Sequence, residues 1–176
     1  MRRFVNPGNT AFEVAVNSQI YVDKTGLLAY TNSVINTKQA LICSSRPRRF
    51  GKSITADMLC AYYSRGCDSD SIFASYEIAK SDSYKKYLNQ YDVIYLDIQW
   101  CMMDAGSAEQ TVSYLNYHVI EELKEIYPQI LLDGIRTAYG AMSCINAQTG
   151  VKFIVIIDEW DVLIRDEAAN EAVLQD

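Results

Sequence analysis

The residues best suited to chemistry lie in two short stretches that are far apart in the chain. The first, residues 45–53, reads Ser-Arg-Pro-Arg-Arg-Phe-Gly-Lys-Ser and lies between a short apolar run and a segment with helical periodicity. Strand, loop, Gly-Lys-Ser and helix, in that order, are the layout of a phosphate-binding loop. Backbone N–H groups at a helix N-terminus have no partner inside the helix, so they attract phosphate oxygens. The pattern predicts that Lys52 reaches the β- and γ-phosphates of a nucleotide and that the Ser53 hydroxyl binds Mg²⁺.

This first stretch departs from the usual glycine pattern of such loops. The glycine expected five residues before Gly51 is replaced by Arg46, and Arg49 stands where many loops carry another glycine. A Gly-Lys-Ser tripeptide by itself is equally compatible with a basic turn that caps a helix. The interpretation therefore depends on the second stretch.

The second stretch, residues 152–161, reads Lys-Phe-Ile-Val-Ile-Ile-Asp-Glu-Trp-Asp. Its apolar, mostly β-branched run predicts a central, fully buried strand of a parallel sheet. The strand would end in Asp158 and Glu159 at the carboxyl edge of the sheet, which is a Walker B pattern. Asp158 would hold Mg²⁺ indirectly or through water, and Glu159 would polarise the attacking water as general base. A loop that merely begins with two acids is the alternative.

Taken together, the two stretches supply what a nucleotide–metal site needs: a phosphate cradle, a hydroxyl ligand and acids at the end of a strand. We therefore expect ATP and Mg²⁺ as cofactors. The predicted catalytic residues are Glu159 and Lys52. The predicted nucleotide-binding residues are Arg48, Arg49, Phe50, Gly51, Lys52 and Ser53, and the predicted metal-binding residues are Ser53 and Asp158. This prediction requires the two stretches to converge in space.

The elements that would position these residues alternate between strand and helix. Residues 41–44 read as a short buried strand before the loop, and helical spacing begins at Ile54. Residues 92–98 read as another buried strand, with Asp97 near its carboxyl end, where open α/β sheets place ligands. An aspartate paired with a neighbouring loop explains Asp97 equally well.

Two further helices follow that strand. Ser107 and Gln110 form a capping box before a long amphipathic helix that Pro128 ends. A second helix is expected from Leu131 to just before Gly150. The alternation predicts an α/β protein with the three-layer αβα arrangement of a P-loop NTPase and a mostly parallel sheet.

The N-terminal part is less regular. Phe12, Val14 and Val16 alternate as in a strand. Asp23 is a plausible N-cap for a short helix that ends near residues 32–36. This helix is either a packing element or a contribution to the base-side wall of a nucleotide pocket. We therefore expect residues 1–38 to be a lead-in segment that packs on a partial NTPase core of residues 39–176.

Composition excludes several classes of protein. The content of 49% apolar and 22% charged residues is that of a globular chain, and the net charge of −6 disfavours direct nucleic-acid binding. The five cysteines form no Cys-x-x-Cys pair and His118 is the single histidine, so a zinc site is not expected. Scattered, odd-numbered cysteines predict reduced, buried thiols and a cytoplasmic location. No signal peptide and no membrane-spanning apolar run are evident.

Three segments resemble those of the predicted AAA-ATPase-like family of bacteria and archaea. They are Tyr-Val-Asp-Lys-Thr at residues 21–25, the loop at residues 46–53 and Ile-Asp-Glu-Trp-Asp at residues 157–161. Arg-Pro-Arg-Arg-Phe-Gly-Lys-Ser is itself similar to that family's phosphate loop, and the paired Arg48 and Arg49 match it. The resemblance implies a P-loop ATPase with an additional strand. Relatives often carry further strands and a C-terminal domain similar to PD-(D/E)XK nucleases.

Two readings of the function remain open. The first is an ATPase module whose hydrolysis drives a conformational change in attached parts. The second is a non-hydrolysing nucleotide-binding or interaction fragment. The sequence ends soon after a helix expected at residues 166–174, so we expect a sheet that lacks the strands beyond the Walker B strand. Either its own missing C-terminal region or other subunits fill that gap, or the sheet closes differently. Direct binding of DNA or RNA by the arginine cluster is the third and least favoured reading. ATP is expected rather than GTP because no Asn-Lys-x-Asp motif is present and because the family resemblance implies an ATPase.

Overall fold

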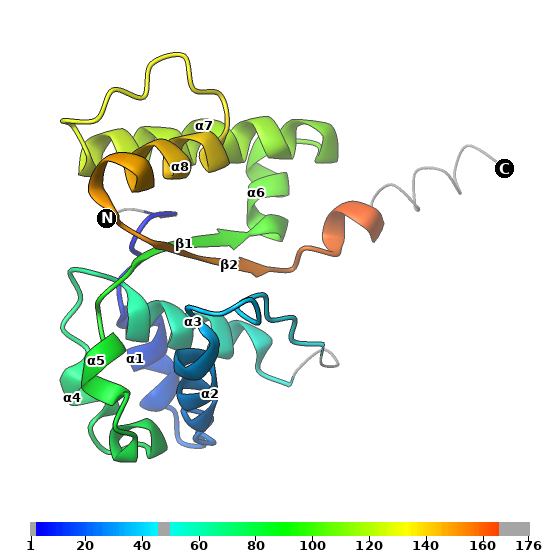
Figure 1. Cartoon of the computed structure of the whole chain (residues 1–176). Helices are drawn as coiled ribbons and strands as arrows, with labels where there is room; N and C mark the ends of the chain where they lie inside the picture. The colour runs from blue at the N-terminus through cyan, green and yellow to red at the C-terminus, as the bar shows by residue number, and fades with distance from the viewer. Residues whose placement is uncertain (1–2, 46–49, 166–176) are drawn as a thin grey trace, which may run out of the picture. The chain divides into compact units, whose positions relative to one another are not determined.

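The computed structural model of the chain describes residues 3–45 and 50–165, which form two compact units (Figure 1). The first unit spans residues 6–93, and the second comprises residues 3–5 together with residues from 94 onward. The division that the sequence predicts between residues 38 and 39 lies inside the first unit. Each unit is described by itself below.

The first unit is helical in the part that the structure describes. Its elements are α1 (Thr10–Val16), α2 (Gly26–Val34), α3 (Lys52–Tyr63), α4 (Asp70–Phe73), the 3₁₀ helix η1 (Glu77–Lys80) and α5 (Tyr84–Tyr87). Helix α3 packs against α1, and α2 packs against η1. The short helix expected after Asp23 is confirmed as α2.

An aromatic cluster forms the core of the first unit. Phe12 stacks on Phe73 at 5.1 Å between ring centroids, and Tyr62 meets Phe73 edge-on at 5.4 Å. The hydroxyls of Tyr62 and Tyr63 are buried but not orphaned, because both hydrogen bond to the Asn32 amide. These contacts fix the C-terminal half of α3, while its first turn is more open to solvent.

Two predictions for the first unit are wrong. The alternation of Phe12, Val14 and Val16 forms helix α1, in which only Phe12 is buried, because the helix places that ring on Phe73. Residues 41–44 form no strand, and the Leu41 side chain is 96% exposed. A four-residue apolar run becomes a strand only when a neighbour supplies the hydrogen-bond ladder, and no described segment pairs with this one.

Hydrogen bonds between Asn6 and residues 92 and 93 join the two ends of the first unit. The Asn6 N–H donates to the Val93 carbonyl at 2.7 Å, and the Val93 N–H donates to the Asn6 side-chain oxygen at 2.8 Å. The Asn6 amide also donates to the carboxylate of Asp92. Residues 87 positions apart are thereby held side by side.

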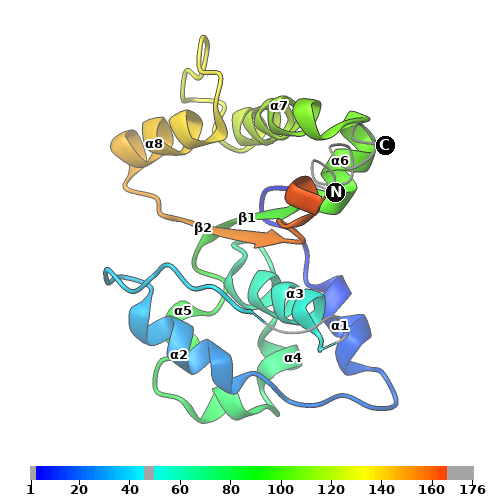
Figure 2. The same cartoon turned by 90° about the vertical axis from the view of Figure 1, so that its right-hand side faces the viewer.

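The second unit is an α/β structure. Strands β1 (Asp92–Asp97) and β2 (Phe153–Asp158) form a parallel two-stranded sheet, and β1 begins with two residues of the first unit. Helices α6 (Ile98–Ala105), α7 (Ala108–Ile126) and α8 (Ala138–Thr149) complete it. In Figures 1 and 2, α7 and α8 run side by side over the same face of this sheet.

Residues 3–5 belong to the second unit although they open the described chain. Val5 forms an antiparallel bridge with Ile94 of β1. The Glu122 carboxylate of α7 accepts the backbone N–H groups of Arg3, Phe4 and Val5 at 2.7–2.9 Å. One side chain thus satisfies three backbone donors that a short edge segment would otherwise leave unpaired.

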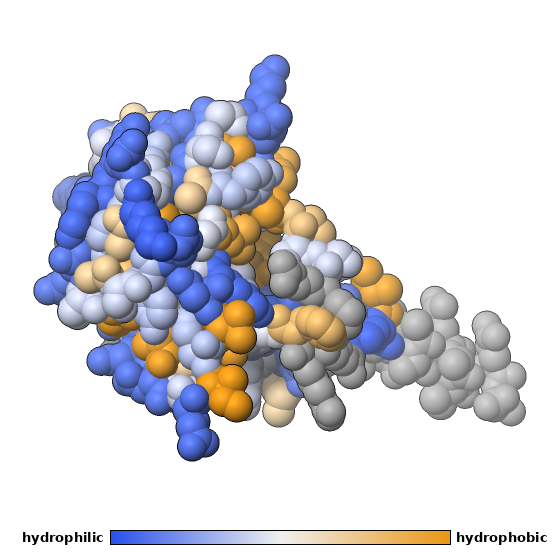
Figure 3. Space-filling view, turned by 90° about the horizontal axis from the view of Figure 1, so that it is seen from below, coloured by the Kyte–Doolittle hydropathy of each residue, from blue (hydrophilic) through white to orange (hydrophobic). Residues whose placement is uncertain are grey.

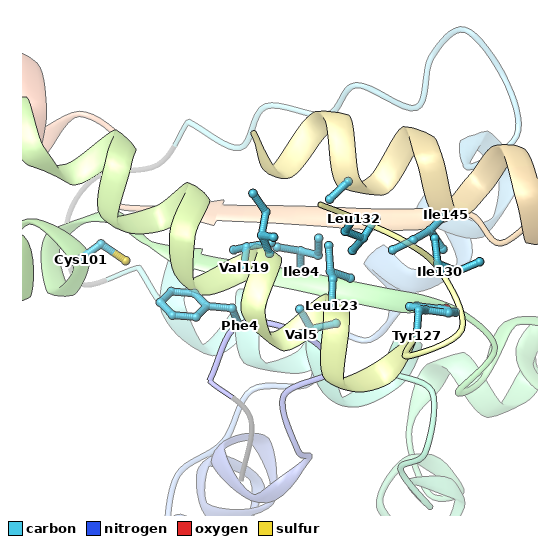
Figure 4. Packing of buried hydrophobic residues seen from close by; sticks show 12 residues of the cluster. Phe4, Val5, Ile94, Cys101, Val119, Leu123, Tyr127, Ile130, Leu132 and Ile145 are labelled. Atoms are coloured by element: carbon cyan, nitrogen blue, oxygen red, sulfur yellow. The ribbon is translucent and has the colours of Figure 1, made fainter. Parts of the chain in front are cut away.

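The core of the second unit lies between the sheet and these helices (Figure 4). Ile94 of β1 meets Val119 and Leu123 of α7 and Ile145 of α8, all of them almost fully buried. Each fully buried aliphatic side chain stabilises the fold by about 1.5–3 kcal/mol relative to an exposed one.

Helix boundaries in this unit follow local signals. The Ser107 hydroxyl accepts from the Gln110 N–H as predicted, and α7 ends at Ile126 before Pro128. Gly150 ends α8 in the left-handed conformation. The start of that helix at Leu131 is wrong: Gly134 lies at φ +79°, which interrupts a helix, and Thr137 provides the cap instead.

Strand β2 is confirmed, but its predicted full burial is wrong. Val155 is 44% and Ile157 is 52% exposed. Other large apolar side chains are also exposed, and Figure 3 shows apolar surface in orange among the hydrophilic blue. The α/β class is therefore confirmed, whereas in the described residues the sheet has two strands and no three-layer core is seen. The helix expected at residues 166–174 lies outside the described residues.

Candidate functional site

Gly51 sets the conformation at the start of α3. It is the N-cap of the helix and adopts φ +73° and ψ 36°, in the left-handed region. A residue with a Cβ pays about 1 kcal/mol or more in this region, whereas glycine adopts it freely. The glycine of Gly-Lys-Ser therefore has a local structural reason: it turns the chain directly into the helix.

The first turn of α3 offers backbone donors. No side chain of the described residues caps this helix, and its first internal hydrogen bond runs from the Thr55 N–H to the Gly51 carbonyl at 3.1 Å. The N–H groups of residues 51–54 consequently have no partner within the helix. Such a set of donors, at the positive end of the helix dipole, suits an anionic group.

Lys52 and Ser53 stand at this helix start. Lys52 is half-buried, Ser53 is exposed, and neither side chain has a hydrogen bond or ion pair to the described residues. Their proposed roles need such freedom, since an ammonium already paired with a carboxylate would be less available to a phosphate. Phe50 is 58% exposed. Arg46, Arg48 and Arg49 lie outside the described residues.

A second ammonium reaches the same place. The Lys24 Nζ donates to the Phe50 carbonyl at 2.9 Å, and it lies 2.9 Å from where a Cβ on Gly51 would be. Neither residue type nor spacing in the sequence predicts a role for Lys24. The only available signal was the resemblance of Tyr-Val-Asp-Lys-Thr to a family signature.

In the second unit, β2 ends in a buried carboxylate. Asp158 is 7% exposed, and its Oδ1 accepts the Glu159 N–H at 3.0 Å. Its Oδ2 is buried and has no hydrogen-bond partner among the residues that the structure describes. A buried carboxylate oxygen without a partner is costly, so this atom is suited to a cation.

Asp97 lies at the carboxyl end of the neighbouring strand β1. Together with Asp158 and Glu159 it forms an acidic edge of the sheet. Burial raises the pKa of Asp97, and the charges of Asp158 and Glu159 raise it further. Asp97 also caps α6 by accepting the Trp100 N–H at 3.0 Å. The sequence analysis weighed Asp97 as a ligand or as a loop partner; the structure shows it as a helix cap beside the two acids.

Glu159, the predicted general base, has a constrained geometry. It lies at φ +51°, an unusual conformation for a residue with a side chain. Its Oε2 is 3.5 Å from the guanidinium of Arg165, which also pairs with Asp161 at 3.2 Å. To accept a proton from water, this carboxylate would have to leave or share its contact with Arg165.

The predicted site residues thus fall into two groups. Lys52 and Ser53 are adjacent at the start of α3 in the first unit, and Asp158 and Glu159 are adjacent at the end of β2 in the second. Each group lies on the element that the sequence predicts for it. The meeting of the two groups around one nucleotide stays a prediction.

A comparison with protein families identifies the chain. Residues 8–176 match the model of the AAA-ATPase-like family, described as predicted AAA-ATPase. The chain belongs to this family. No curated protein and no solved structure matches it.

Membership in the AAA-ATPase-like family supports nucleotide binding, so the acidic edge was tested for its fit to Mg²⁺. The described residues contain no group of three or more His, Cys, Asp or Glu that could hold a metal. Magnesium usually takes only one or two protein carboxylates, with water and substrate phosphates as the other ligands. The free Oδ2 of Asp158 fits such a partial site.

Two further expectations concern the environment of the protein. No helix in the described part of the chain is long and apolar enough to cross a membrane. All five cysteines are free thiols, as predicted, but only Cys60 and Cys101 are buried and Cys43 is exposed. The prediction of uniformly buried thiols is therefore wrong.

Proposed function

We propose that this AAA-ATPase-like chain is an ATP-binding module that hydrolyses ATP in a Mg²⁺-dependent manner and couples hydrolysis to conformational change in a full-length protein. The observation that carries the proposal is the start of α3. Gly51 in the left-handed conformation begins the helix, and the N–H groups of its first turn lie next to the side chains of Lys52 and Ser53, which make no hydrogen bond or ion pair to the described residues. This arrangement suits the β- and γ-phosphates of a nucleotide.

Each predicted residue has a role in this proposal. Lys52 neutralises phosphate charge, and the Ser53 hydroxyl and the Asp158 carboxylate hold Mg²⁺, which when bound stabilises the charge that develops on the phosphates. Glu159 orients the attacking water and accepts its proton. The arginines Arg48 and Arg49 add positive charge to the phosphate loop.

The specificity and the partners are part of the same proposal. ATP is preferred over GTP on the strength of family membership and of the missing Asn-Lys-x-Asp motif. Other regions of a longer protein or other subunits would receive the conformational change. Direct nucleic-acid binding is not proposed, because the net charge of −6 disfavours it.

The test is thermal unfolding with and without Mg-ATP for the wild type, Lys52→Ala and Lys38→Ala. Lys38 is an exposed lysine of the same unit and serves as the matched control. At a hundredfold excess of Mg-ATP over its dissociation constant, binding adds about 2.7 kcal/mol, so the wild type and Lys38→Ala should melt roughly 5–10 °C higher. Lys52→Ala should show little shift. If Lys52→Ala shifts as much as the wild type, the site assignment is wrong.

One observation favours a second candidate function, nucleotide binding without hydrolysis. The Oε2 of Glu159 lies 3.5 Å from the guanidinium of Arg165, which would compete with an attacking water for this carboxylate. Phosphate release by the wild type and by Glu159→Gln separates the two candidates. A rate at least a hundredfold higher for the wild type supports hydrolysis through Glu159, and equal rates together with tight Mg-ATP binding support the non-hydrolysing module.

A further inference from the structure

Lys24 makes a contact that its neighbours in sequence do not explain. It precedes α2, yet its ammonium donates to the carbonyl of Phe50, in the peptide that leads into Gly51 and α3. The distance is 2.9 Å, within the normal range for a hydrogen bond from a charged donor. Lys24 thus joins the segment before α2 to the start of the phosphate loop's helix.

The two residues beside Lys24 hold that segment in place. The Asp23 carboxylate accepts the Thr25 N–H at 2.8 Å and the Glu77 N–H at 2.9 Å. The Thr25 hydroxyl accepts the Ile78 N–H at 3.2 Å, and Thr25 is fully buried. Asp23 and Thr25 therefore fix the segment to η1. The backbone of Lys24, which lies between them, is held in place.

The peptide that Lys24 contacts can turn over unless something holds it. A trans peptide is planar, so its carbonyl and its N–H point in opposite directions. When Lys24 holds the Phe50 carbonyl, it also sets the direction of the Gly51 N–H. Gly51 has no side chain to resist a flip of this peptide, and glycine tolerates both signs of φ.

We propose that Lys24 is a positioning residue of the phosphate-binding site. By holding the Phe50 carbonyl, it keeps the Gly51 N–H aligned with the free N–H groups of the first turn of α3, for a polyphosphate ligand. The proposal rests on the proposed function and specifies how its phosphate cradle is kept open. It replaces the interpretation that this segment forms the base-side wall of the pocket.

The two interpretations predict different ligand dependences. A residue that orients a phosphate-binding peptide affects every ligand that carries the polyphosphate, whether or not a base is attached. A residue of the base-side wall affects only ligands that carry the base. Inorganic tripolyphosphate and ATP, each with Mg²⁺, distinguish them.

The experiment measures dissociation constants for Mg-ATP and Mg-tripolyphosphate by calorimetry. The variants are Lys24→Met, Lys24→Arg, the control Lys38→Met, and Lys52→Ala. We expect Lys24→Met to weaken the binding of both ligands about tenfold, because the charge-assisted hydrogen bond from Lys24 that orients the peptide between Phe50 and Gly51 is lost. Lys24→Arg keeps a donor of similar reach and should stay within about threefold of the wild type, and Lys38→Met should match the wild type.

The outcomes that overturn the proposal are distinct from those that overturn the function. Failure of the wild type to bind, or binding by Lys52→Ala equal to the wild type, removes the proposed function and this inference with it. Wild-type affinity in Lys24→Met, or a loss restricted to Mg-ATP, removes the inference alone. The same holds if Lys24→Met without ligand melts several degrees below Lys38→Met, since the role would then be general stability.

Discussion

The start of α3 and the end of β2 are predicted to serve the same nucleotide, yet they are built in opposite ways. At the helix start, the Phe50 carbonyl is held by Lys24, and the N–H groups of residues 51–54 have no partner within the helix. At the strand end, Asp158 is buried with one carboxylate oxygen unpaired, beside Asp97, whose pKa is raised.

The difference teaches which half of the candidate site depends on its ligand. The helix start does not bury an unpaired charge, because Lys52 is only half-buried and Ser53 is exposed. The strand end carries the buried Oδ2 of Asp158, which has no hydrogen-bond partner among the described residues, so it gains the most when a cation binds. The predictions below test this contrast, from the largest expected effect to the smallest.

The largest effect is expected from a double-mutant cycle across the two regions. Lys52→Ala and Asp158→Asn should each weaken Mg-ATP binding at least about 30-fold, because each removes a charged contact to the ligand. If both regions hold the same Mg-ATP, the double variant should be at least about fivefold better than the product of the two single losses. Titration calorimetry measures all four proteins.

The control for this cycle is Asp161→Asn, which removes an acid just beyond β2 that pairs with Arg165. It should bind Mg-ATP nearly as the wild type does. Losses of Lys52→Ala and Asp158→Asn that multiply without coupling would mean that the two regions do not share one ligand, and the comparison would lose its basis.

The next largest effect is expected from a comparison of the substitutions Gly51→Ala and Gly66→Ala. Both glycines lie in the left-handed region, at φ +73° and +85°, but only a Cβ on Gly51 would meet Lys24. Alanine at either position should lower the free energy of unfolding by about 1 kcal/mol, measured by urea denaturation. Only Gly51→Ala should also weaken Mg-ATP binding. Equal binding by the two variants would show that the helix start tolerates displacement of Lys24.

A smaller effect is expected at the acidic edge from Asp97→Asn. Because burial and the neighbouring acids raise the pKa of Asp97 in the folded state, its charge destabilises the protein once the pH rises above that raised value. Asparagine still caps α6, so the variant should be more stable at pH 7 by up to about 1 kcal/mol. The gain should vanish as the pH falls below the ordinary range of a carboxyl group, followed by thermal unfolding.

Asp104 offers a control of opposite sign for this prediction. Its hydrogen bond with Arg3 lowers the pKa of Asp104, so Asp104→Asn should be less stable than the wild type at neutral pH. A neutral or destabilising effect of Asp97→Asn at pH 7 would mean that the strand end is not electrostatically strained.

The smallest effect is expected from Asp23, whose hydrogen bonds anchor the segment that contains Lys24. Partial burial alone would raise the pKa of Asp23, but the N–H groups of Glu77 and Thr25 outweigh it and lower the pKa. The ionised form then stabilises the folded state above the ordinary carboxyl pKa, and this contribution is lost as the pH falls through the lowered value. Asp23→Asn should cost about 0.5 kcal/mol at pH 7 and nothing in strong acid. A difference that persists at acid pH would exclude this cause.

The features that the sequence predicts correctly are those with a local cause. The Ser107 cap, the stop before Pro128 and the strand that ends at Asp158 each depend on a few adjacent residues. Gly51 and Lys52 at the start of α3 are of the same kind.

The features that it misses depend on partners far away in the chain. Leu41 is apolar enough for a strand but has no described strand beside it, and Phe12 joins a helix because Phe73 supplies a stacking partner. The contact from Lys24 to Phe50 spans 26 residues, and the unpaired Oδ2 of Asp158 is known only once burial is known. No periodicity or spacing encodes such pairings.

Two sets of hydrogen bonds bear on the order in which the protein folds during translation. One joins Glu122 to the backbone of residues 3–5, and the other joins Asn6 to Val93. The second unit is discontinuous in sequence, with the whole first unit inserted after its opening segment. Residues 3–5 are translated before the first unit but can reach their places only after α7 has been translated. Asn6 and Val93, at the two ends of the inserted first unit, hydrogen bond to each other. The first unit can therefore fold during translation, before the second unit is complete.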